Sequence, residues 1–187
     1  GPLFNGKNIR VVDCGDIPGD PADIKGHYRI AETVVKTILK RKALPVVIGG
    51  DHGVPIPVFR ALDGHGPITL VQIDAHIDWR DEINGVHEGY SSPIRRASEL
   101  SHIDRIFQIG MRGQGSARAK EVEDALAYAT ARGALVVMAA GNEGFEEPSH
   151  PAHSADRWGI AVGASDVLGN FAWWSNRAGF TDNYVVA

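Results

Sequence analysis

Short apolar runs alternate along this 187-residue chain with longer stretches in which apolar residues recur at helical spacing. In the stretch 27–41, for example, Ile30, Val34 and Ile38 recur every four residues and give one face of a helix an apolar stripe. Strands that alternate with helices form parallel βαβ units, because a parallel neighbour can be reached only through a crossover connection. The order therefore predicts an α/β fold, with three αβα layers around a mostly parallel sheet.

Strands are expected at 9–12, 45–48, 68–73, 106–109, 134–139, 158–162 and 184–186, and helices at 27–41, 55–62, 92–100 and 117–132. The last helix is rich in Ala, Glu and Leu, and its acidic residues Glu121, Glu123 and Asp124 are expected on a solvated face. Ligands bind beyond the carboxyl ends of the strands in such sheets. Polar, Gly-rich turns stand at three of these ends, at 49–53, 74–78 and 141–144.

The turn at 74–78 reads Asp-Ala-His-Ile-Asp. At the end of an extended strand, alternate residues point to one side, so Asp74, His76 and Asp78 are expected to present two carboxylates and an imidazole together. His52 follows the preceding predicted strand and would join them if the two strands are neighbours. Mixed oxygen and nitrogen ligands suit Mn²⁺, with Zn²⁺ and Fe²⁺ as competitors. The spacing and order of these residues favour a metal site over solvated loop residues.

The sequence "GGDH" at 49–52, followed by "DAHID" at 74–78, resembles the ureohydrolase family, the arginases and agmatinases. Residues 90–97 ("YSSPIRRA") and 109–112 ("IGMR") resemble agmatinase-type sequences. The resemblance covers about residues 5–125 and implies an α/β fold, a two-manganese centre and hydrolysis of a guanidino group to urea and an amine. It assigns His52, Asp74 and Asp78 to one metal and Asp74 and His76 to the other. It also leaves a homo-oligomer open, since related ureohydrolases form symmetric oligomers.

The resembled family completes its centre with a later Asp-x-Asp pair, which this sequence lacks. After residue 125 the aspartates Asp156, Asp166 and Asp182 stand singly. Without the pair, the second metal would keep two ligands, and metal affinity should fall steeply. We therefore expect a weak or partial Mn²⁺ site with little or no turnover. The first candidates to replace the missing carboxylates are Asp13, Asp51 and Glu143.

Residues 135–144 ("LVVMAAGNEG") resemble a different family, the subtilisin-like serine proteases, and 160–165, 171–176 and 184–187 fit that family in the same order. This second resemblance covers about residues 119–187. It implies that Asn142 is the side-chain amide donor of an oxyanion hole. The Asp, His and Ser motifs of the catalytic triad are absent, and no Gly-x-Ser-x-Gly elbow occurs elsewhere. Asn142 is therefore expected to be idle, and proteolysis is not expected.

The two resemblances together predict a chimera. Residues 1–125 form a ureohydrolase-like α/β portion, and residues 126–187 form a subtilase-like α/β portion that is expected to continue the same sheet. The seam lies within 117–133, a helix that both families accept. The function expected is that of an agmatinase-like hydrolase in origin. The alternatives are a non-catalytic chimeric fold and a subtilase fragment without its triad.

Composition and charge exclude other classes of protein. The net charge is −4 and no basic stripe or long run of Lys and Arg occurs, so a nucleic-acid partner is not expected. No apolar run is long enough to cross a membrane, and no signal-peptide pattern is present. Cys14 is the single cysteine, which rules out an internal disulfide and fits a reducing compartment. We therefore expect a cytoplasmic protein whose partner, if it is active, is a small guanidino compound.

Overall fold

Helices and strands alternate along the chain in the computed structural model, which describes residues 11–20, 22–110, 113 and 115–186. The helices are α1 (Ile24–Lys40), α2 (Pro55–Ala61), α3 (Pro93–Ser98), α4 (Ala119–Ala131) and α5 (Ala155–Trp158), with the 3-10 helix η1 (Ala152–Ser154) before α5. The strands are β1 (Ile68–Ile73), β2 (Ile103–Ile109), β3 (Val136–Ala139), β4 (Gly159–Gly163) and β5 (Tyr184–Val186). The α/β class is confirmed. Among the described residues, no helix is both long and apolar enough to cross a membrane.

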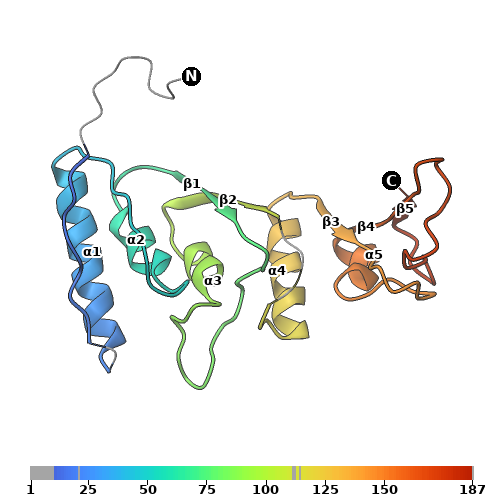
Figure 1. Ribbon diagram of the computed structural model, residues 1–187, viewed down its shortest axis with the longest axis horizontal. Coiled ribbons are helices and arrows are strands. Elements are labelled where there is room, and N and C mark those ends of the chain that lie inside the picture. Colours follow the sequence, from blue (N-terminus) through green and yellow to red (C-terminus); the bar gives the residue numbers. More distant parts are fainter. Residues whose placement is uncertain (1–10, 21, 111–112, 114, 187) are drawn as a thin grey trace, which may run out of the picture.

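Every ladder between these strands is parallel, but the ladders form two sheets. β1 pairs with β2, with Ile73 opposite Ile109. The second sheet has the order β3-β4-β5, with Ala139 opposite Val162. The prediction that the later strands continue the first sheet is wrong for the described residues, because no ladder joins β2 to β3. In Figure 1, α4 lies between the two sheets, below the level of β2 and β3.

Two predicted strands do not form within the described residues. Of the segment 9–12, Ile9 and Arg10 lie outside those residues, and Val11 and Val12 belong to no helix or strand. The segment 45–48 also lies outside every ladder, and its Ile48 is 90% exposed. Branched apolar residues favour a strand, but a strand also needs a neighbour within hydrogen-bonding distance. The ladders provide none for this segment.

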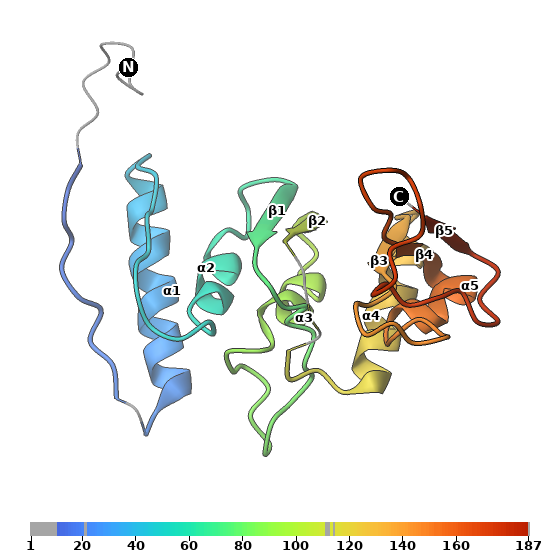
Figure 2. The same ribbon diagram turned by 45° about the vertical axis from the view of Figure 1, so that its right-hand side comes forward.

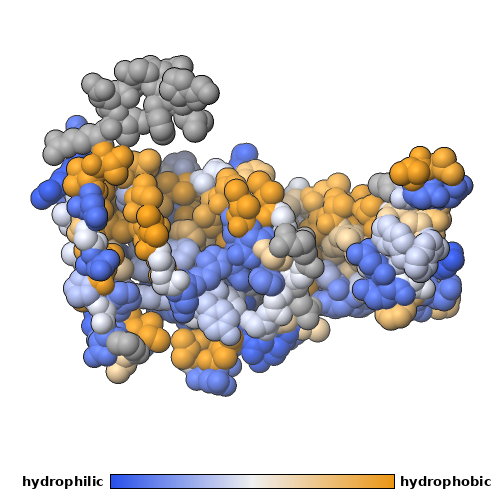
Figure 3. Space-filling model, viewed as in Figure 1, coloured by the Kyte–Doolittle hydropathy of each residue, from blue (hydrophilic) through white to orange (hydrophobic). Residues whose placement is uncertain are grey.

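The strand layer has one covered face and one open face. Figures 1 and 2 show α2, α3 and α4 on one side of the strands, where Gln72 is buried and Leu70 and Ile106 are half-buried. The large side chains exposed on the strands include Val71, Ile73, Phe107, Ile109 and Val137. Hydrophobic residues accordingly gather along the strand side of the molecule in Figure 3. Parallel sheets are normally covered on both faces. Here one face carries exposed apolar side chains instead, so it forms an open apolar surface.

The hydrophobic core is centred on α4. This helix contributes Val122, Ala125 and Leu126 to a cluster of buried hydrophobic residues. The same cluster contains Ile77, Trp79 and Ile94 from the first portion of the chain and Met138, Ala152, Ala155 and Ala161 from the second. The two portions on either side of the predicted seam therefore share one core.

Polar and aromatic side chains of α4 contact both portions of the chain. The ring of Tyr128 lies 5.0 Å from that of Trp79, and the Tyr128 hydroxyl donates to the carbonyl of Ser98 at 3.3 Å. On the other side, Thr130 Oγ1 donates to the carbonyl of Trp158 at 3.2 Å. Partly buried hydroxyl groups need hydrogen-bond partners, and the hydroxyls of Tyr128 and Thr130 in α4 find theirs in backbone carbonyls of both portions.

Because the core is shared, we predict that the chain unfolds as one unit and that Leu126→Ala lowers its free energy of unfolding by about 2–4 kcal/mol. Urea unfolding measured by tryptophan fluorescence and by far-UV circular dichroism should give coincident transitions, both displaced to lower urea in the variant. Leu168→Ala is the matched control, because Leu168 is 82% exposed and the same atoms are removed. Two separate transitions, of which Leu126→Ala displaces only one, would contradict the shared core.

Candidate metal centre

Two loops bring the candidate ligands together. Asp74 follows β1 directly, and its backbone N–H donates to the carbonyl of Ile109 at 3.1 Å, so the first sheet fixes the start of this loop. His52 lies just before α2 and follows Gly50, which has a φ of 74°. A Cβ at Gly50 would lie 2.4 Å from Cγ2 of Val54. The turn that leads into His52 therefore requires glycine.

His52, Asp74 and Asp78 form a compact cluster. Nδ1 of His52 lies 3.0 Å from Oδ2 of Asp78 and 3.6 Å from Oδ2 of Asp74. One ligand atom from each residue lies within 4.8 Å of the other two, and in the part of the chain that the structure describes no other group of three His, Cys, Asp or Glu residues meets this spacing. One imidazole and two carboxylates so placed fit a single divalent ion.

His76 takes a different position from the other three predicted ligands. Its Nδ1 lies 3.4 Å from Oδ1 of Asp74, and its side chain is 55% exposed, compared with 6% for that of Asp78. Asp78 has a φ of 49°, so the segment 74–78 bends instead of continuing as an extended strand. His76 lies beside Asp74 but does not join the three-residue group of His52, Asp74 and Asp78. Asp78 turns inwards, and His76 stays at the surface beside Asp74.

The protein holds Asp78 from several sides. Its Oδ2 accepts a hydrogen bond from Nε2 of Gln72 at 2.6 Å, and its backbone carbonyl accepts one from the N–H of Arg95 at 3.3 Å. The pKa of Asp78 is raised overall, and burial is the largest cause. The negative charge of Asp74 also raises it, whereas His52 and the hydrogen bond from Gln72 lower it. The buried carboxylate therefore depends on a nearby cation and a hydrogen-bond donor to remain charged.

The other predicted site residues lie outside this cluster. Asn142 is exposed in the turn after β3, and its backbone N–H donates to Oε2 of Glu143 at 3.0 Å. Asp13, Asp51 and Glu143, the candidates to replace the missing carboxylates, do not join the three-residue cluster within the described residues. Asp51 instead accepts the backbone N–H of Gly53 at 2.8 Å and shapes the loop before α2.

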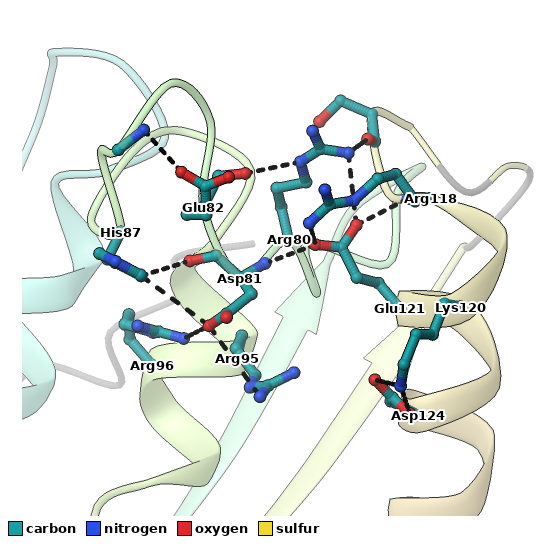
Figure 4. Close-up of polar contacts among 12 residues, drawn as sticks. Arg80, Asp81, Glu82, His87, Arg95, Arg96, Arg118, Lys120, Glu121 and Asp124 are labelled. Carbon is teal, nitrogen blue, oxygen red and sulfur yellow. Dashed lines mark hydrogen bonds and ion pairs between the residues drawn. The ribbon is translucent and has the colours of Figure 1, made fainter.

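A polar network that the sequence did not predict fixes the chain just after Asp78. Glu121 was expected on a solvated helix face but is only 4% exposed. It accepts the backbone N–H of Asp81 at 3.0 Å and that of Arg118 at 2.7 Å, and it pairs with Nη1 of Arg80 at 3.3 Å (Figure 4). The sequence feature that could have predicted this role is the position of Glu121 in the first turn of α4, where a carboxylate caps free backbone N–H groups.

The same loop is also tied to α3. Asp81 accepts a hydrogen bond from Nη2 of Arg96 at 2.7 Å, and this bond lowers the pKa of the Asp81 carboxyl (Figure 4). Nδ1 of His87 lies 3.1 Å from the backbone carbonyl of Asp81. The loop that follows the candidate metal ligands is therefore held between α3 and α4.

Residues 2–140 of the chain match the model of the Arginase family. Among curated proteins, the guanidinobutyrase of Pseudomonas aeruginosa is 37% identical over 111 residues, which are 58% of this chain. The match spans 35% of the length of that relative. The chain thus corresponds to about a third of a curated relative, and the family match runs past residue 125, the predicted end of the ureohydrolase-like portion.

Solved structures show the same fold. A variant of the formiminoglutamase of Trypanosoma cruzi, solved with Mn²⁺, is 30% identical with a TM-score of 0.51, over 60% of this chain and 39% of that protein. The formiminoglutamase itself, also solved with Mn²⁺, has a TM-score of 0.51 at 21% identity, over 93% of this chain and 65% of that protein. At that identity the second likeness concerns the fold alone, and it extends well beyond residue 140.

Glu121→Gln should lower the free energy of unfolding at pH 7 by about 2–3 kcal/mol, because Arg80 loses a buried anionic partner. Burial raises the pKa of Glu121, but hydrogen bonds from Arg118 and Asp81 outweigh it and lower the pKa from 4.5 to about 2. A depressed carboxyl pKa gives stability that is present above pH 4.5 and is lost as the pH falls towards 2.

The check is urea unfolding of wild type and Glu121→Gln at pH 7 and pH 3. Glu147→Gln is the control, because Glu147 is exposed and forms no ion pair within the described residues. The difference between wild type and Glu121→Gln should shrink at pH 3, and the control should stay near wild type at both values. An equal difference at pH 7 and pH 3 would show that the Glu121 charge does not provide the stability.

Proposed function

Because the chain belongs to the arginase family, we propose that His52, Asp74 and Asp78 are the ligands of a Mn²⁺ site that derives from an agmatinase-like ureohydrolase centre. The single observation that carries this proposal is the convergence of one imidazole and two carboxylates within 4.8 Å. The proposal concerns a chain that spans 35% of its guanidinobutyrase relative, so activity and substrate are parts of the proposal.

The choice of ion follows from the donor atoms. Two carboxylates and one imidazole give a mixed oxygen and nitrogen set, which Mn²⁺ accepts and which Zn²⁺ and Fe²⁺ also accept. The Trypanosoma cruzi relative at 30% identity was solved with Mn²⁺, which favours manganese. His76 is proposed as a further ligand, because it faces Oδ1 of Asp74 while His52 faces Oδ2. Asp74 is thus placed to share its two oxygens between two sites.

The reaction class proposed is hydrolysis of a guanidino C–N bond. Water adds to the guanidino carbon, the bond to the substituted nitrogen breaks, and urea and a protonated amine leave. A divalent ion bound at such a centre supplies Lewis-acid chemistry, because it lowers the pKa of a coordinated water. The role of Asp74 and Asp78 is to hold and neutralise that ion, and the role of His52 is to complete its ligand set.

We also propose that this centre is incomplete and that turnover is small or absent. The sequence has no Asp-x-Asp pair after residue 125, and the described residues provide one three-residue cluster. Three protein ligands hold one ion, whereas His76 and one oxygen of Asp74 are too few to hold a second tightly. Residues 126–140 lie within the family match, so of the expected subtilase-like portion at 126–187 only residues 141–187 are proposed to be a subtilase-like segment, in which Asn142 has no catalytic partner.

Mn²⁺ should raise the thermal unfolding midpoint of the protein, because a ligand that binds only the folded state stabilises it by mass action. Asp78→Asn should abolish most of that rise, since one anionic ligand is lost from the cluster. Asp182→Asn is the matched control, because Asp182 is exposed and outside the cluster. A midpoint that does not respond to Mn²⁺ would support the alternative of a non-catalytic fold without a metal.

Urea release from agmatine, arginine and guanidinobutyrate should be low or absent even at saturating Mn²⁺. The assay is colorimetric detection of urea after incubation with purified protein, and Asp74→Asn provides the background. Clear turnover that Asp74→Asn abolishes would contradict the incompleteness of the centre, while leaving the family and the reaction class in place.

A further inference from the structure

Two glutamines lie side by side in the first sheet, under the candidate metal cluster. Gln72 and Gln108 are register partners in the β1–β2 ladder. Both point to the side of the sheet that the helices cover, and Gln72 is 8% exposed. Carboxamides are unusual on a buried strand face, because each has two donors and an acceptor that need partners away from water. Their partners therefore show what the pair does.

The hydrogen bonds of the pair run in one direction. Nε2 of Gln108 donates to the backbone carbonyl of Ile77 at 3.0 Å and to Oε1 of Gln72 at 2.6 Å. Because a backbone carbonyl can only accept, the amino group of Gln108 must face Ile77. The oxygen of Gln72 must then face Gln108, and the amino group of Gln72 must face Asp78, 2.6 Å from Oδ2. The carbonyl of Ile77 thus fixes the orientation of both carboxamides.

This orientation gives Asp78 a fixed donor. The side chain of Asp78 is 6% exposed, and the residue has a φ of 49°, so its backbone occupies a conformation that L-residues rarely adopt. The N–H from Gln72 and the ring of His52, at 3.0 Å, approach the same oxygen, Oδ2. A donor on one side of a carboxylate oxygen limits the directions from which a cation can approach it. Hydrogen bonds of this kind orient metal ligands in proteins.

We propose that Gln72 and Gln108 are positioning residues for the metal cluster, which hold the Asp78 carboxylate in the orientation needed to share an ion with His52 and Asp74. The inference rests on the proposed function. Gln108 acts through Gln72, and Gln72 acts through Asp78, so neither carboxamide needs to touch the ion. Loss of either carboxamide should weaken metal binding about 10–100-fold, the range found for groups that orient metal ligands.

The test is the dissociation constant of Mn²⁺ for Gln72→Met and Gln108→Met, measured by isothermal titration calorimetry and by electron paramagnetic resonance of the bound ion. Methionine keeps the length of the side chain and removes the hydrogen bonds. Val71→Met is the matched control, because Val71 neighbours Gln72 but is exposed on the opposite face. The Mn²⁺ dissociation constants of both glutamine variants should rise about 10–100-fold, and that of the Val71→Met control should stay unchanged.

A role in packing alone predicts a different result, namely a lower free energy of unfolding of the metal-free variants with an unchanged Mn²⁺ constant. That result would overturn the inference. The double variant provides a further check. If the two carboxamides act in series, removing both should weaken Mn²⁺ binding no more than removing Gln72 alone. Two effects that add would contradict the series.

A measurement without metal separates this inference from the proposed function. In the metal-free protein, the side-chain amide resonances of Gln72 should shift on Asp78→Asn, because the acceptor of Gln72 loses its charge. Those of Gln108 should shift with them, because Gln108 donates to Gln72. Neither set should shift on Asp182→Asn. Unchanged resonances would overturn the inference whether or not Mn²⁺ binds. Absence of Mn²⁺ binding to the wild type, with shifted resonances, would overturn the proposed metal site and leave the hydrogen-bonded series intact.

Discussion

The packing of α4 between the two portions of the chain is the interaction on which the rest of the structure depends. No ladder joins the two sheets within the described residues, so the sheets are connected through side chains. Val122, Ala125 and Leu126 provide the apolar part of this connection. Glu121 provides the polar part, because it receives N–H groups from the loop after Asp78 and from the start of its own helix. Both kinds of contact are buried away from water, where apolar contacts are favourable and polar contacts are stronger. They therefore join the two short sheets.

The candidate metal cluster depends on this connection through one loop. Asp78 stands between a strand below it, which offers Gln72, and a loop after it, which Arg80 and Asp81 tie to α4. Asp81 is also tied to α3 through Arg96. The unusual backbone conformation of Asp78 is thus held by partners on all sides, which is how proteins maintain strained residues at functional sites. A cation-binding carboxylate needs such support, because its own burial favours the neutral form.

The sequence predicts those parts of the structure that follow from local pattern. All four predicted helices and the cluster residues His52, Asp74 and Asp78 were found this way, since periodicity and motif spacing are local properties. The positive φ of Asp78 was not predicted, because this conformation depends on partners in β1 and α3. The burial of Glu121 was missed for a similar reason. A carboxylate on a helix is normally solvated, and only the fold shows that Arg80 lies against it.

The carboxylate of Glu143 takes part in contacts away from the candidate metal cluster. Glu143 was a candidate, but its Oε2 accepts hydrogen bonds from Nδ2 of Asn176 at 2.9 Å and from Oγ of Ser149 at 3.2 Å. The hydrogen bond from Asn176, the larger cause, lowers the pKa of Glu143. Asn176 is fully buried, and its Oδ1 also accepts the backbone N–H groups of Glu143 and Phe145.

The carboxylate of Glu143 therefore serves to shape the turn after β3, in a sheet that is not hydrogen-bonded to the first. Without Glu143, the carboxamide of Asn176 would lose one of its two acceptors. Glu121 secures the loop after Asp78 and Glu143 secures the turn after β3, so neither is free to complete a second metal site.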